Sequence, residues 1–207
     1  MRGKFIVFEG SDGSGKTTIL NNIKKYLDDN KIDYIMTREP GGTEISEKIR
    51  DILLSNDNDE MCPRTEALLY AASRAQHIDE VIKPALAKGK LVISDRFVMS
   101  SLAYQGYGRE LGYERVKMVN DFAIDETLPD YTIFLNVDPI TVLNRKRSNV
   151  VADRLENEDE EYHKRVYEGY QKMLQKKEDS LVIVDASKSI EEVTKDTLEV
   201  LLNIIGG

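Results

Sequence analysis

A glycine-rich segment near the start of the chain has the residue types that bind a polyphosphate. Residues 10–17 read Gly-Ser-Asp-Gly-Ser-Gly-Lys-Thr and fit the pattern G-x-x-x-x-G-K-[ST]. In such a loop, backbone N–H groups at a helix start surround the phosphates, Lys16 contacts the terminal phosphates, and Thr17 binds Mg²⁺. The alternative is an ordinary glycine-rich turn. The strand-like run Phe5–Phe8 before it and the helix-like run Thr18–Leu27 after it favour the phosphate loop.

Asp95 and Arg96 form a second candidate site, at the end of the apolar run that begins at Leu91. An Asp that ends a strand beside a phosphate loop can hold Mg²⁺, directly or through water. The alternative is an Asp that caps a helix or a turn. Arg96 suits bidentate phosphate binding. Arg38, Arg50 and Arg74 are further candidates, and a surface salt bridge is the alternative for each, most of all for Arg50.

A third group of residues could form a wall for a flat polar base. Tyr70, Arg74 and His77 have the spacing i, i+4 and i+7 and so share one face of a predicted helix. Gln105 carries both donors and an acceptor and could read a base edge. The alternatives are that Tyr70 belongs to the core and that Gln105 lies near a helix end with a glycine cap. We expect His77 to be structural.

Two further segments are typical of a ligand cleft. Glu39-Pro40-Gly41-Gly42 is a tight turn in which the backbone can approach a ligand while Glu39 points into the cleft. Residues 145–154 carry Arg145, Arg147, Asp153 and Arg154 around a short uncharged stretch. Phosphoryl transfer needs positively charged side chains beside the migrating group, and it needs water to be excluded. A segment with several arginines could provide both, so we expect a lid at about residues 145–157.

Strands and helices alternate along the chain, which predicts an α/β fold with a doubly wound, mostly parallel sheet. The expected strands are Lys4–Glu9, Tyr34–Thr37, Leu91–Ser94, Tyr131–Val137 and Leu181–Val184. The expected helices are Lys16–Asp29, Glu44–Leu54, Arg64–Lys88, Tyr113–Asp125, Pro139–Lys146, Glu158–Lys177 and Ile190–Ile204. In such folds ligands bind beyond the carboxyl ends of the strands. The unusual residues follow the first four strands, so we expect them on one rim.

Length and composition limit the possible classes of protein. The 207 residues suffice for one domain, which we expect to span 1–207. The net charge of −8 argues against a nucleic-acid-binding surface. Cys62 is the only cysteine, so no intrachain disulfide can form and a cytoplasmic location is expected. No apolar run approaches the roughly 20 residues that span a bilayer, so we expect neither membrane association nor a signal peptide.

These motifs together resemble those of thymidylate kinases, the bacterial dTMP kinase family of the nucleoside-monophosphate kinases. The resemblance covers essentially the whole chain and rests on FEGSDGSGKTT at 8–18, TREPGGT at 37–43, LLYAASRAQH at 68–77, DRF at 95–97, SSLAYQGYGR at 100–109 and DRLENED at 153–159. It implies a P-loop NTPase fold with a five-stranded parallel sheet, usually as a homodimer. The implied reaction is transfer of the ATP γ-phosphoryl group to dTMP, giving dTDP and ADP, for dTTP biosynthesis (de novo and salvage).

The resemblance also implies roles for individual residues. The ATP site would comprise Gly10, Ser11, Asp12, Gly13, Ser14, Gly15, Lys16, Thr17 and Thr18, with Mg²⁺ held by Thr17 and Asp95. The dTMP site would comprise Asp12, Arg38, Glu39, Pro40, Arg50, Tyr70, Arg74, Arg96, Ser101, Tyr104 and Gln105. Within it, Asp12 would bind the 3′-hydroxyl, Arg96 and Arg38 the phosphate, Tyr70 would stack on thymine, and Tyr104 would crowd the sugar's 2′ position.

The chain departs from some family members at the base site and in the loop. Tyr70 stands where some have Phe, and its hydroxyl then needs a bonded or wet exit. Met99 stands where some have an acid, and we assign it no role. The loop interior contains no arginine, which resembles the branch in which the lid supplies the catalytic arginine. We therefore expect Arg147 or Arg154 to act beside Lys16 and Arg96 in catalysis.

Two other functions remain open from the sequence. A nucleoside kinase would need a carboxylate to activate a neutral hydroxyl, and Glu39 could serve. A nucleotide-binding switch would hydrolyse or bind a nucleotide without an acceptor, but it has no need of the second, base-binding wall. The dTMP phosphate is already an anion, so the dTMP kinase reaction needs no strong general base.

Overall fold

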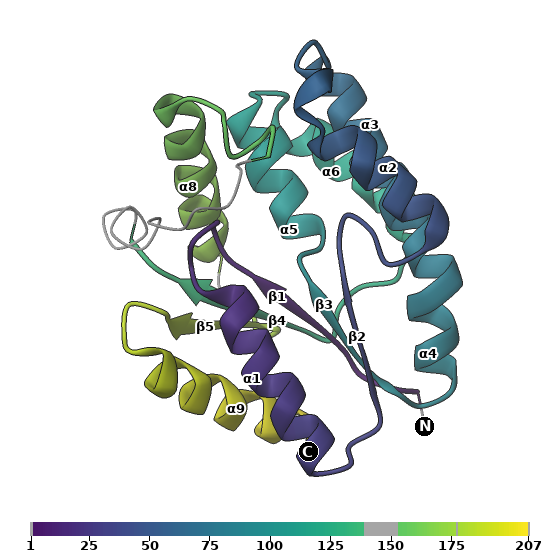
Figure 1. Ribbon diagram of the computed structural model, residues 1–207, viewed down its shortest axis with the longest axis vertical. Coiled ribbons are helices and arrows are strands. Elements are labelled where there is room, and N and C mark those ends of the chain that lie inside the picture. The colour runs from purple at the N-terminus through teal and green to yellow at the C-terminus, as the bar shows by residue number, and fades with distance from the viewer. Residues whose placement is uncertain (1, 139–152, 177, 207) are drawn as a thin grey trace.

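Five parallel strands form one sheet in the order β2-β3-β1-β4-β5 (Figure 1). The computed structural model describes residues 2–138, 153–176 and 178–206. The strands are β1 (Phe5–Glu9), β2 (Tyr34–Arg38), β3 (Leu91–Asp95), β4 (Tyr131–Asn136) and β5 (Leu181–Asp185). Each predicted strand is confirmed to within one residue at its ends. The expected α/β fold with a parallel sheet is therefore confirmed.

The register of the central strands brings their carboxyl ends level. Asp95 of β3 lies opposite Phe8 of β1 on one side and Arg38 of β2 on the other. Phe8 is also opposite Ile133 of β4. Because all these strands run in the same direction, the loops that follow them leave from one edge of the sheet. This is the rim on which the sequence placed its unusual residues.

The helices largely follow the predicted pattern. Their bounds are α1 (Lys16–Asp29), α2 (Glu44–Leu54), α3 (Pro63–His77), α4 (Lys83–Ala87), α5 (Val98–Ser101), α6 (Tyr113–Ile124), α8 (Glu160–Leu174) and α9 (Ile190–Gly206). Local capping explains some of the starts. Thr43 accepts a hydrogen bond from the backbone N–H of Ser46 at α2, and Asp159 accepts one from Tyr162 at α8.

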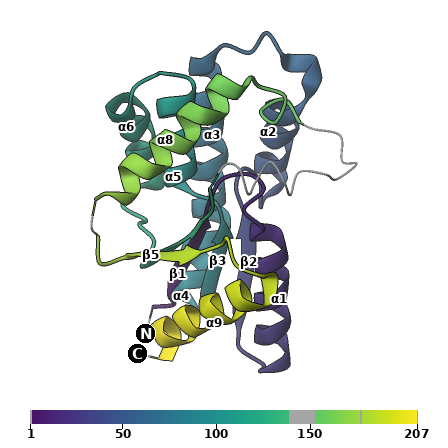
Figure 2. The same cartoon turned by 90° about the vertical axis from the view of Figure 1, so that its left-hand side faces the viewer.

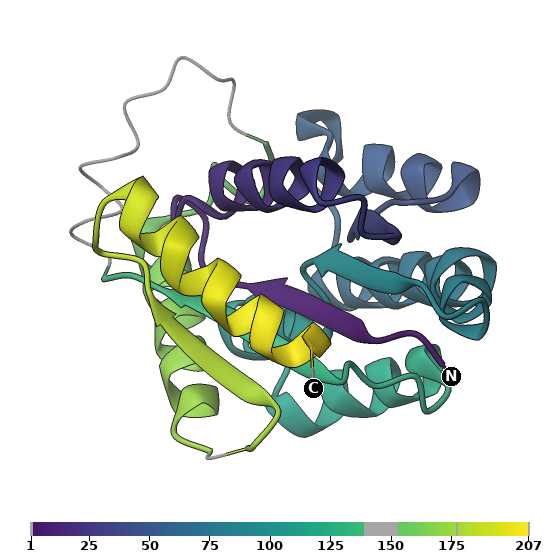
Figure 3. The ribbon, with the colours of Figure 1, turned by 90° about the horizontal axis from the view of Figure 1, so that it is seen from below.

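Alternation along β1 sorts its side chains between two cores. Ile6 and Phe8 pack with Ile19, Ile23 and other residues of α1 and α9, which lie on the same side of the sheet (Figure 3). Phe5 and Val7 face the other core, around α4 and the end of α6. Glu9 follows them at the same parity, so this carboxylate points to the side of the sheet where α5 begins.

Two helical regions differ from the prediction. The expected helix Arg64–Lys88 contains the π-helical turn η2 (Ile78–Ile82) between α3 and α4. Pro84 lacks a backbone N–H, and so the regular α-helical hydrogen-bond ladder cannot run through it. Residues 98–108, where a helix end was weighed only as the alternative for Gln105, are helical, with α5 followed by the π-helical η3 (Leu102–Gly108). The expected helix Pro139–Lys146 lies outside the described residues.

Helices α2, α3, α5, α6 and α8 gather beyond the carboxyl end of the sheet, while α1 and α9 lie beside it (Figure 2). Short η1 (Asn56–Asn58) follows α2. A third core joins α8 to η3 through Tyr104, Tyr162, Val166 and Tyr170. This helical layer supplies a wall that faces the loops of the sheet. Within the residues described, no helix is long and apolar enough to cross a membrane.

Candidate functional site

The glycine-rich loop lies between β1 and α1, as its motif requires. Gly10 and Gly15 have positive φ values of 150° and 86°. A Cβ on Gly10 would lie 2.9 Å from the carbonyl oxygen of Leu135, so a larger residue would disturb the loop. The side chain of Ser14 is buried, and its Oγ has no hydrogen-bond partner among the described residues. An unpaired polar atom inside such a loop is suited to a bound phosphate.

Lys16 is held beside Asp95 at the start of α1. Its Nζ lies 2.7 Å from Asp95 Oδ1, and the lysine side chain is 8% exposed. Burial lowers the pKa of Lys16, and the nearby Arg96 lowers it further, whereas Asp95 acts in the opposite direction. Anionic phosphates beside this ammonium group would favour its charged form. The register of β1 and β3 thus places a cation and a carboxylate together at the loop.

Thr17 and Asp95 offer a hydroxyl and a carboxylate oxygen, the hard ligands that Mg²⁺ prefers. In the described part of the chain, no group of three or more His, Cys, Asp or Glu side chains gathers into a metal site. Magnesium in kinases is commonly held by one or two protein ligands together with substrate phosphates and water. The residues present therefore fit a magnesium ion that arrives with a nucleotide.

Arg96 connects the loop to the helical layer. Its backbone is left-handed, with φ of 70°, which turns the side chain back across the rim. The guanidinium donates to Asp12 and, at 3.0 Å, to the carbonyl oxygen of Gly10. Tyr104 donates to Asp12 Oδ2 at 2.6 Å. A cation inside the cleft is therefore already paired with a carboxylate of the phosphate loop.

Glu9 supports Arg96 from below. It is fully buried and accepts hydrogen bonds from the backbone N–H groups of Phe97 and Ser100, at 2.9 and 3.0 Å. Its other oxygen accepts from Ser100 Oγ at 2.6 Å, and that hydroxyl also accepts from Arg96. Burial raises the pKa of Glu9, and Arg96 together with these hydrogen bonds opposes the rise. The carboxylate thus holds the start of α5 and, through Ser100, the guanidinium.

Glu39 and Arg74 form a buried ion pair on the opposite wall. Arg74 Nε donates to Glu39 Oε2 at 2.7 Å, and both side chains are 2% exposed. His77 Nδ1 lies 2.9 Å from Glu39 Oε1, and its Nε2 lies 2.7 Å from Thr37 Oγ1. A Cβ on Gly42 would lie 2.7 Å from the His77 ring, so this turn needs glycine there. The geometry agrees with a structural role for His77.

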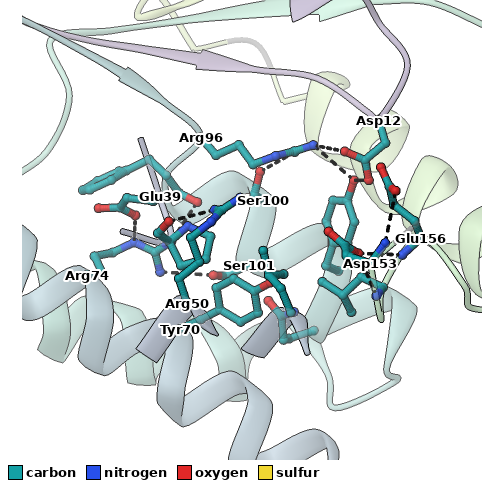
Figure 4. Close-up of a pocket in the computed structure, with 16 residues that line it drawn as sticks. Asp12, Glu39, Arg50, Tyr70, Arg74, Arg96, Ser100, Ser101, Asp153 and Glu156 are labelled. Atoms are coloured by element: carbon teal, nitrogen blue, oxygen red, sulfur yellow. Dashed lines mark hydrogen bonds and ion pairs between the residues drawn. The ribbon is translucent and has the colours of Figure 1, made fainter. Parts of the chain in front are cut away.

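A cavity lies between these walls (Figure 4). In the close-up, Arg96 and Asp12 lie on one side, Arg74 and Glu39 on another, and Asp153 and Glu156 approach from the segment before α8. The lining includes ten residues that the sequence had proposed for dTMP: Asp12, Glu39, Pro40, Arg50, Tyr70, Arg74, Arg96, Ser101, Tyr104 and Gln105. Residues from six separate stretches of the chain therefore converge on one space.

Arg38 is the one proposed dTMP residue that does not line this cavity. Its side chain is half exposed, and its Nη2 lies 2.7 Å from Glu47 Oε2. Glu47 Oε1 in turn accepts from the backbone N–H of Gly42 at 2.8 Å. Arg50, by contrast, donates to the carbonyl oxygen of Pro40 at 2.9 Å and lies at the cavity. Arg50 thus supports the Glu39-Pro40 turn.

The candidate lid arginines fall into two groups. Arg145 and Arg147 lie outside the described residues. Arg154 is buried: its Nη2 donates to Glu66 Oε2 at 2.7 Å and its Nε to the carbonyl oxygen of Leu53 at 2.9 Å. In this structure the Arg154 guanidinium therefore joins α2 and α3, and it can follow a phosphoryl group only by leaving Glu66.

Sequence reasoning missed Glu9 and Glu66, although a signal was present for each. Glu9 ends a strand directly before the phosphate loop, as Asp95 ends another. Glu66 lies four residues before Tyr70 and eight before Arg74, so it belongs to the same helix face. Each is fully buried, and a buried carboxylate needs partners to offset its desolvation. Those partners are distant in sequence and become visible only in the fold.

Comparisons with known proteins agree with the geometry. A family model described as thymidylate kinase matches residues 8–197. The thymidylate kinase of Finegoldia magna is 54% identical over 197 residues, which cover 95% of this chain and 97% of that protein. The thymidylate kinase of Lactobacillus acidophilus is 50% identical over 201 residues, with 96% and 93% covered. The crystal structure of thymidylate kinase from Ehrlichia chaffeensis has a TM-score of 0.77 at 32% identity, covering 97% of this chain and 99% of that one.

Proposed function

The chain belongs to the thymidylate kinase family, and we propose which of its residues carry out the reaction of that family. The enzyme transfers the γ-phosphoryl group of ATP to the 5′-phosphate of dTMP, giving dTDP and ADP for dTTP biosynthesis. ATP is the phosphoryl donor and Mg²⁺ the cofactor. The observation that carries the assignment is the cavity lined by Tyr70, Arg74 and Gln105, which is joined to the phosphate loop through the Asp12–Arg96 pair.

On the donor side, the backbone N–H groups of residues 10–18 and the Lys16 ammonium bind the ATP phosphates. Thr17 and Asp95 hold Mg²⁺, which supplies positive charge to the phosphate oxygens when it is bound. Lys16 is already directed at the rim by Asp95, 2.7 Å away. A phosphate that binds the Lys16 ammonium group would displace the Asp95 carboxylate. Asp95 could then bind Mg²⁺.

On the acceptor side, Arg96 binds the phosphate of dTMP and Asp12 its 3′-hydroxyl. Tyr104 crowds the 2′ position, Tyr70 stacks on thymine, and Arg74, Ser101 and Gln105 surround its edge. Pro40 and Arg50 complete this wall, and Arg38 contributes from the exposed rim, where it can join only by leaving Glu47. The acceptor phosphate is an anion at neutral pH, so the enzyme works by positioning and charge neutralisation.

Glu39 is poorly placed to act as a base, which argues against the nucleoside-kinase alternative. Its two oxygens are occupied by Arg74 and His77, and the residue is 4% exposed. A carboxylate in this position orients Arg74 and is not available to a neutral hydroxyl. The presence of an acceptor pocket likewise disfavours a nucleotide-binding switch.

We further propose that residues 1–207 form a single kinase domain with a lid at about 145–157, in which Arg147 or Arg154 neutralises the migrating phosphoryl group. The enzyme acts in the cytoplasm and as a homodimer. Support for a dimer comes from large exposed apolar side chains on neighbouring helices: Leu68 on α3 and Met118 and Phe122 on α6. Burial of such side chains against a second copy would remove them from water.

An ADP-release assay across all nucleoside monophosphates, with thymidine as an added acceptor, tests the assignment. We expect strong ADP release with ATP, Mg²⁺ and dTMP, and little with purine monophosphates or without an acceptor. Phosphorylation of thymidine but not dTMP would indicate a nucleoside kinase. Release of ADP independent of any acceptor would indicate a nucleotide-binding switch.

A further inference from the structure

Glu66 on α3 is a fully buried carboxylate to which the phosphoryl transfer described above assigns no part. Three side chains donate to it from two separate segments, Gln105 and Arg109 from η3 and its end, and Arg154 from the segment before α8. Gln105 Nε2 lies 2.9 Å from Oε1, Arg109 Nη2 lies 3.0 Å from Oε2, and Arg154 Nη2 lies 2.7 Å from the same Oε2. Glu66 therefore ties the base pocket to the segment that contains Arg154.

These contacts determine the orientation of the Gln105 side-chain amide, that is, which of its ends faces Glu66. A carboxylate with guanidinium groups against its oxygens can only accept further hydrogen bonds. Gln105 must then present its NH₂ group to Glu66, because its carbonyl oxygen would be repelled there. The two guanidinium groups on Oε2 keep the carboxylate from turning away. The nitrogen and oxygen of an amide are nearly the same size, so the charges around them must decide which is which. Here the guanidinium-paired carboxylate of Glu66 decides it.

The opposite end of the same amide has no partner among the residues that the structure describes. Gln105 is 1% exposed and lines the cavity, yet its Oε1 accepts no hydrogen bond from any residue in the described part of the chain. Nor is Oε1 among the fully enclosed polar atoms that lack a partner. An acceptor that is neither paired nor enclosed faces the cavity, where a ligand N–H can reach it.

Arg74 adds a donor beside this acceptor. Nε donates to Glu39, Nη1 to Ser101 and Asn120, and Nη2 to the carbonyl oxygen of Phe97. A guanidinium has five N–H groups, so one on Nη2 remains for a ligand. The wall thus offers an acceptor and a donor. Thymine and uracil present an N3–H donor beside the O4 acceptor, while cytosine presents an acceptor at N3 and an amino group at C4.

We propose that Glu66 is a positioning residue that holds the Gln105 carbonyl toward the cavity, so that the acceptor site selects a keto pyrimidine and rejects cytosine. This inference rests on the proposed function, because it concerns the base of the acceptor. Glu66 touches no substrate and acts through Gln105. Were the amide turned over, its NH₂ group would face the cavity, where it repels N3–H of thymine and matches N3 of cytosine.

The variant Glu66→Gln tests the proposal, because an amide at 66 can offer Gln105 either a carbonyl or an NH₂ group. We measure kcat/KM for dTMP, dUMP and dCMP, and KM for ATP. The preference for dTMP over dCMP should fall by about tenfold, the value of roughly one hydrogen bond. The ratio of dTMP to dUMP should not change, because both bases present the same edge. KM for ATP should change less than about twofold.

Glu158→Gln is the matched control. Glu158 Oε1 lies 2.5 Å from Arg109 Nη2, so this variant also removes a carboxylate from Arg109, but Glu158 has no contact with Gln105 among those described. It should leave the ratio of dTMP to dCMP as in the wild type. Gln105→Ala and the double variant with Glu66→Gln complete a cycle, in which Glu66→Gln should have no further effect on this ratio once Gln105 is absent.

Several outcomes would overturn the proposal. One is a folded Glu66→Gln enzyme with an unchanged ratio of dTMP to dCMP. Another is an equal loss for all three acceptors, which would indicate a purely structural role. If Glu66→Gln does not fold, NMR of the wild type decides: cross-relaxation between the Gln105 NH₂ protons and Glu66 side-chain protons is expected, and its absence contradicts the pairing. A wild-type enzyme without dTMP activity would instead contradict the proposed function.

Discussion

Lys16 is paired with the carboxylate of Asp95 before substrates bind. Asp95 lies 2.7 Å from its ammonium group in a largely buried setting. Burial disfavours that charge and lowers the pKa of Lys16, so an anionic ligand beside the ammonium group would stabilise its charged form. This is the electrostatic basis on which the first prediction rests.

Replacement of Lys16 by Ala should lower kcat by at least about a hundredfold, because the β- and γ-phosphates lose their nearest cation as charge develops. Steady-state kinetics with ATP and dTMP provide the measurement. Lys25→Ala is the control, since Lys25 is an exposed residue of the same helix and should leave kcat unchanged. A near-normal kcat for Lys16→Ala would refute the assignment of the phosphate loop.

The two lid candidates should behave differently when replaced by Ala. Arg147→Ala should lower kcat more than it raises KM for dTMP, with little effect on stability. Arg154→Ala should also lower the free energy of unfolding by about 3 kcal/mol, because it leaves buried Glu66 without one of its guanidinium partners. Kinetics and urea denaturation of both variants provide the measurement. Unchanged kcat in both would place the catalytic cation elsewhere.

At the scale of elements, Glu9 is the contact through which β1 holds α5. The carboxylate accepts from two backbone N–H groups, those of Phe97 and Ser100, at the helix start. Helix starts expose such donors. A carboxylate there accepts hydrogen bonds from them, and its negative charge interacts favourably with the positive end of the helix dipole. The same helix leads into η3, so β1 sets the position of Tyr104 and Gln105 as well as that of the loop.

Glu9 should give protein stability a recognisable pH dependence. Its pKa in the folded state is above the ordinary value of 4.5, chiefly through burial. The folded state then holds a proton that the unfolded state has released, so the free energy of unfolding falls as pH rises from 4.5 through the folded pKa. Glu9→Gln has no such proton. The stability of the wild type minus that of Glu9→Gln should therefore decrease over this range.

Urea denaturation at several pH values above 4.5 measures this difference. Glu114→Gln, at an exposed acid of α6, should show a constant difference from the wild type. A stability difference between wild type and Glu9→Gln that rises with pH would show that the pKa of Glu9 is lowered, contrary to this account.

The packing of α8 on η3 depends on glycine at one crossing. A Cβ on Gly169 would lie 2.6 Å from Tyr107 Cδ2 and 2.8 Å from its Cβ, closer than real Cβ contacts allow. Gly169→Ala should therefore lower the free energy of unfolding by about 1–3 kcal/mol. Thermal and urea denaturation measure the effect. Gly206→Ala is the control, because nothing lies within 4 Å of a Cβ there; equal stabilities would mean that the helices separate without cost.

At the scale of the whole molecule, the exposed apolar side chains on α3 and α6 form the surface that we propose as the dimer interface. Phe122 is 88% exposed and Met118 is 72% exposed, although neither serves the cavity. The two helices pack together in the layer beyond the sheet (Figure 1). A second copy covering this surface would explain why large apolar side chains remain outside the core.

Phe122→Lys should convert the proposed homodimer into a monomer, because it places a charge in a surface that would otherwise be desolvated. Sedimentation velocity of wild type and variant provides the measurement. Ile190→Lys, at the start of α9, is the control and should remain dimeric. A wild type that sediments as a monomer, or a dimeric Phe122→Lys, would contradict the proposed interface.

Much of this architecture is readable from local patterns in the chain. Apolar runs bounded by turns located the five strands, and the loop motif with the residues after each strand located the rim. These features depend on neighbours in sequence: side-chain alternation, helix caps and the φ freedom of glycine. The helix at 98–108 was missed because its π-helical turns follow no 3.6-residue repeat.

The pairing of charged side chains was decided only by the tertiary structure. Local sequence placed Arg154 in a lid and Arg38 at a phosphate, but the fold pairs Arg154 with Glu66 and Arg38 with Glu47. It likewise gives Glu9 a partner 161 residues away and Glu66 a partner 88 residues away. A buried charge is stable only where several donors converge on it, and that convergence depends on how distant elements pack. The residue types therefore indicate the chemistry, while the packing selects which of them is free to perform it.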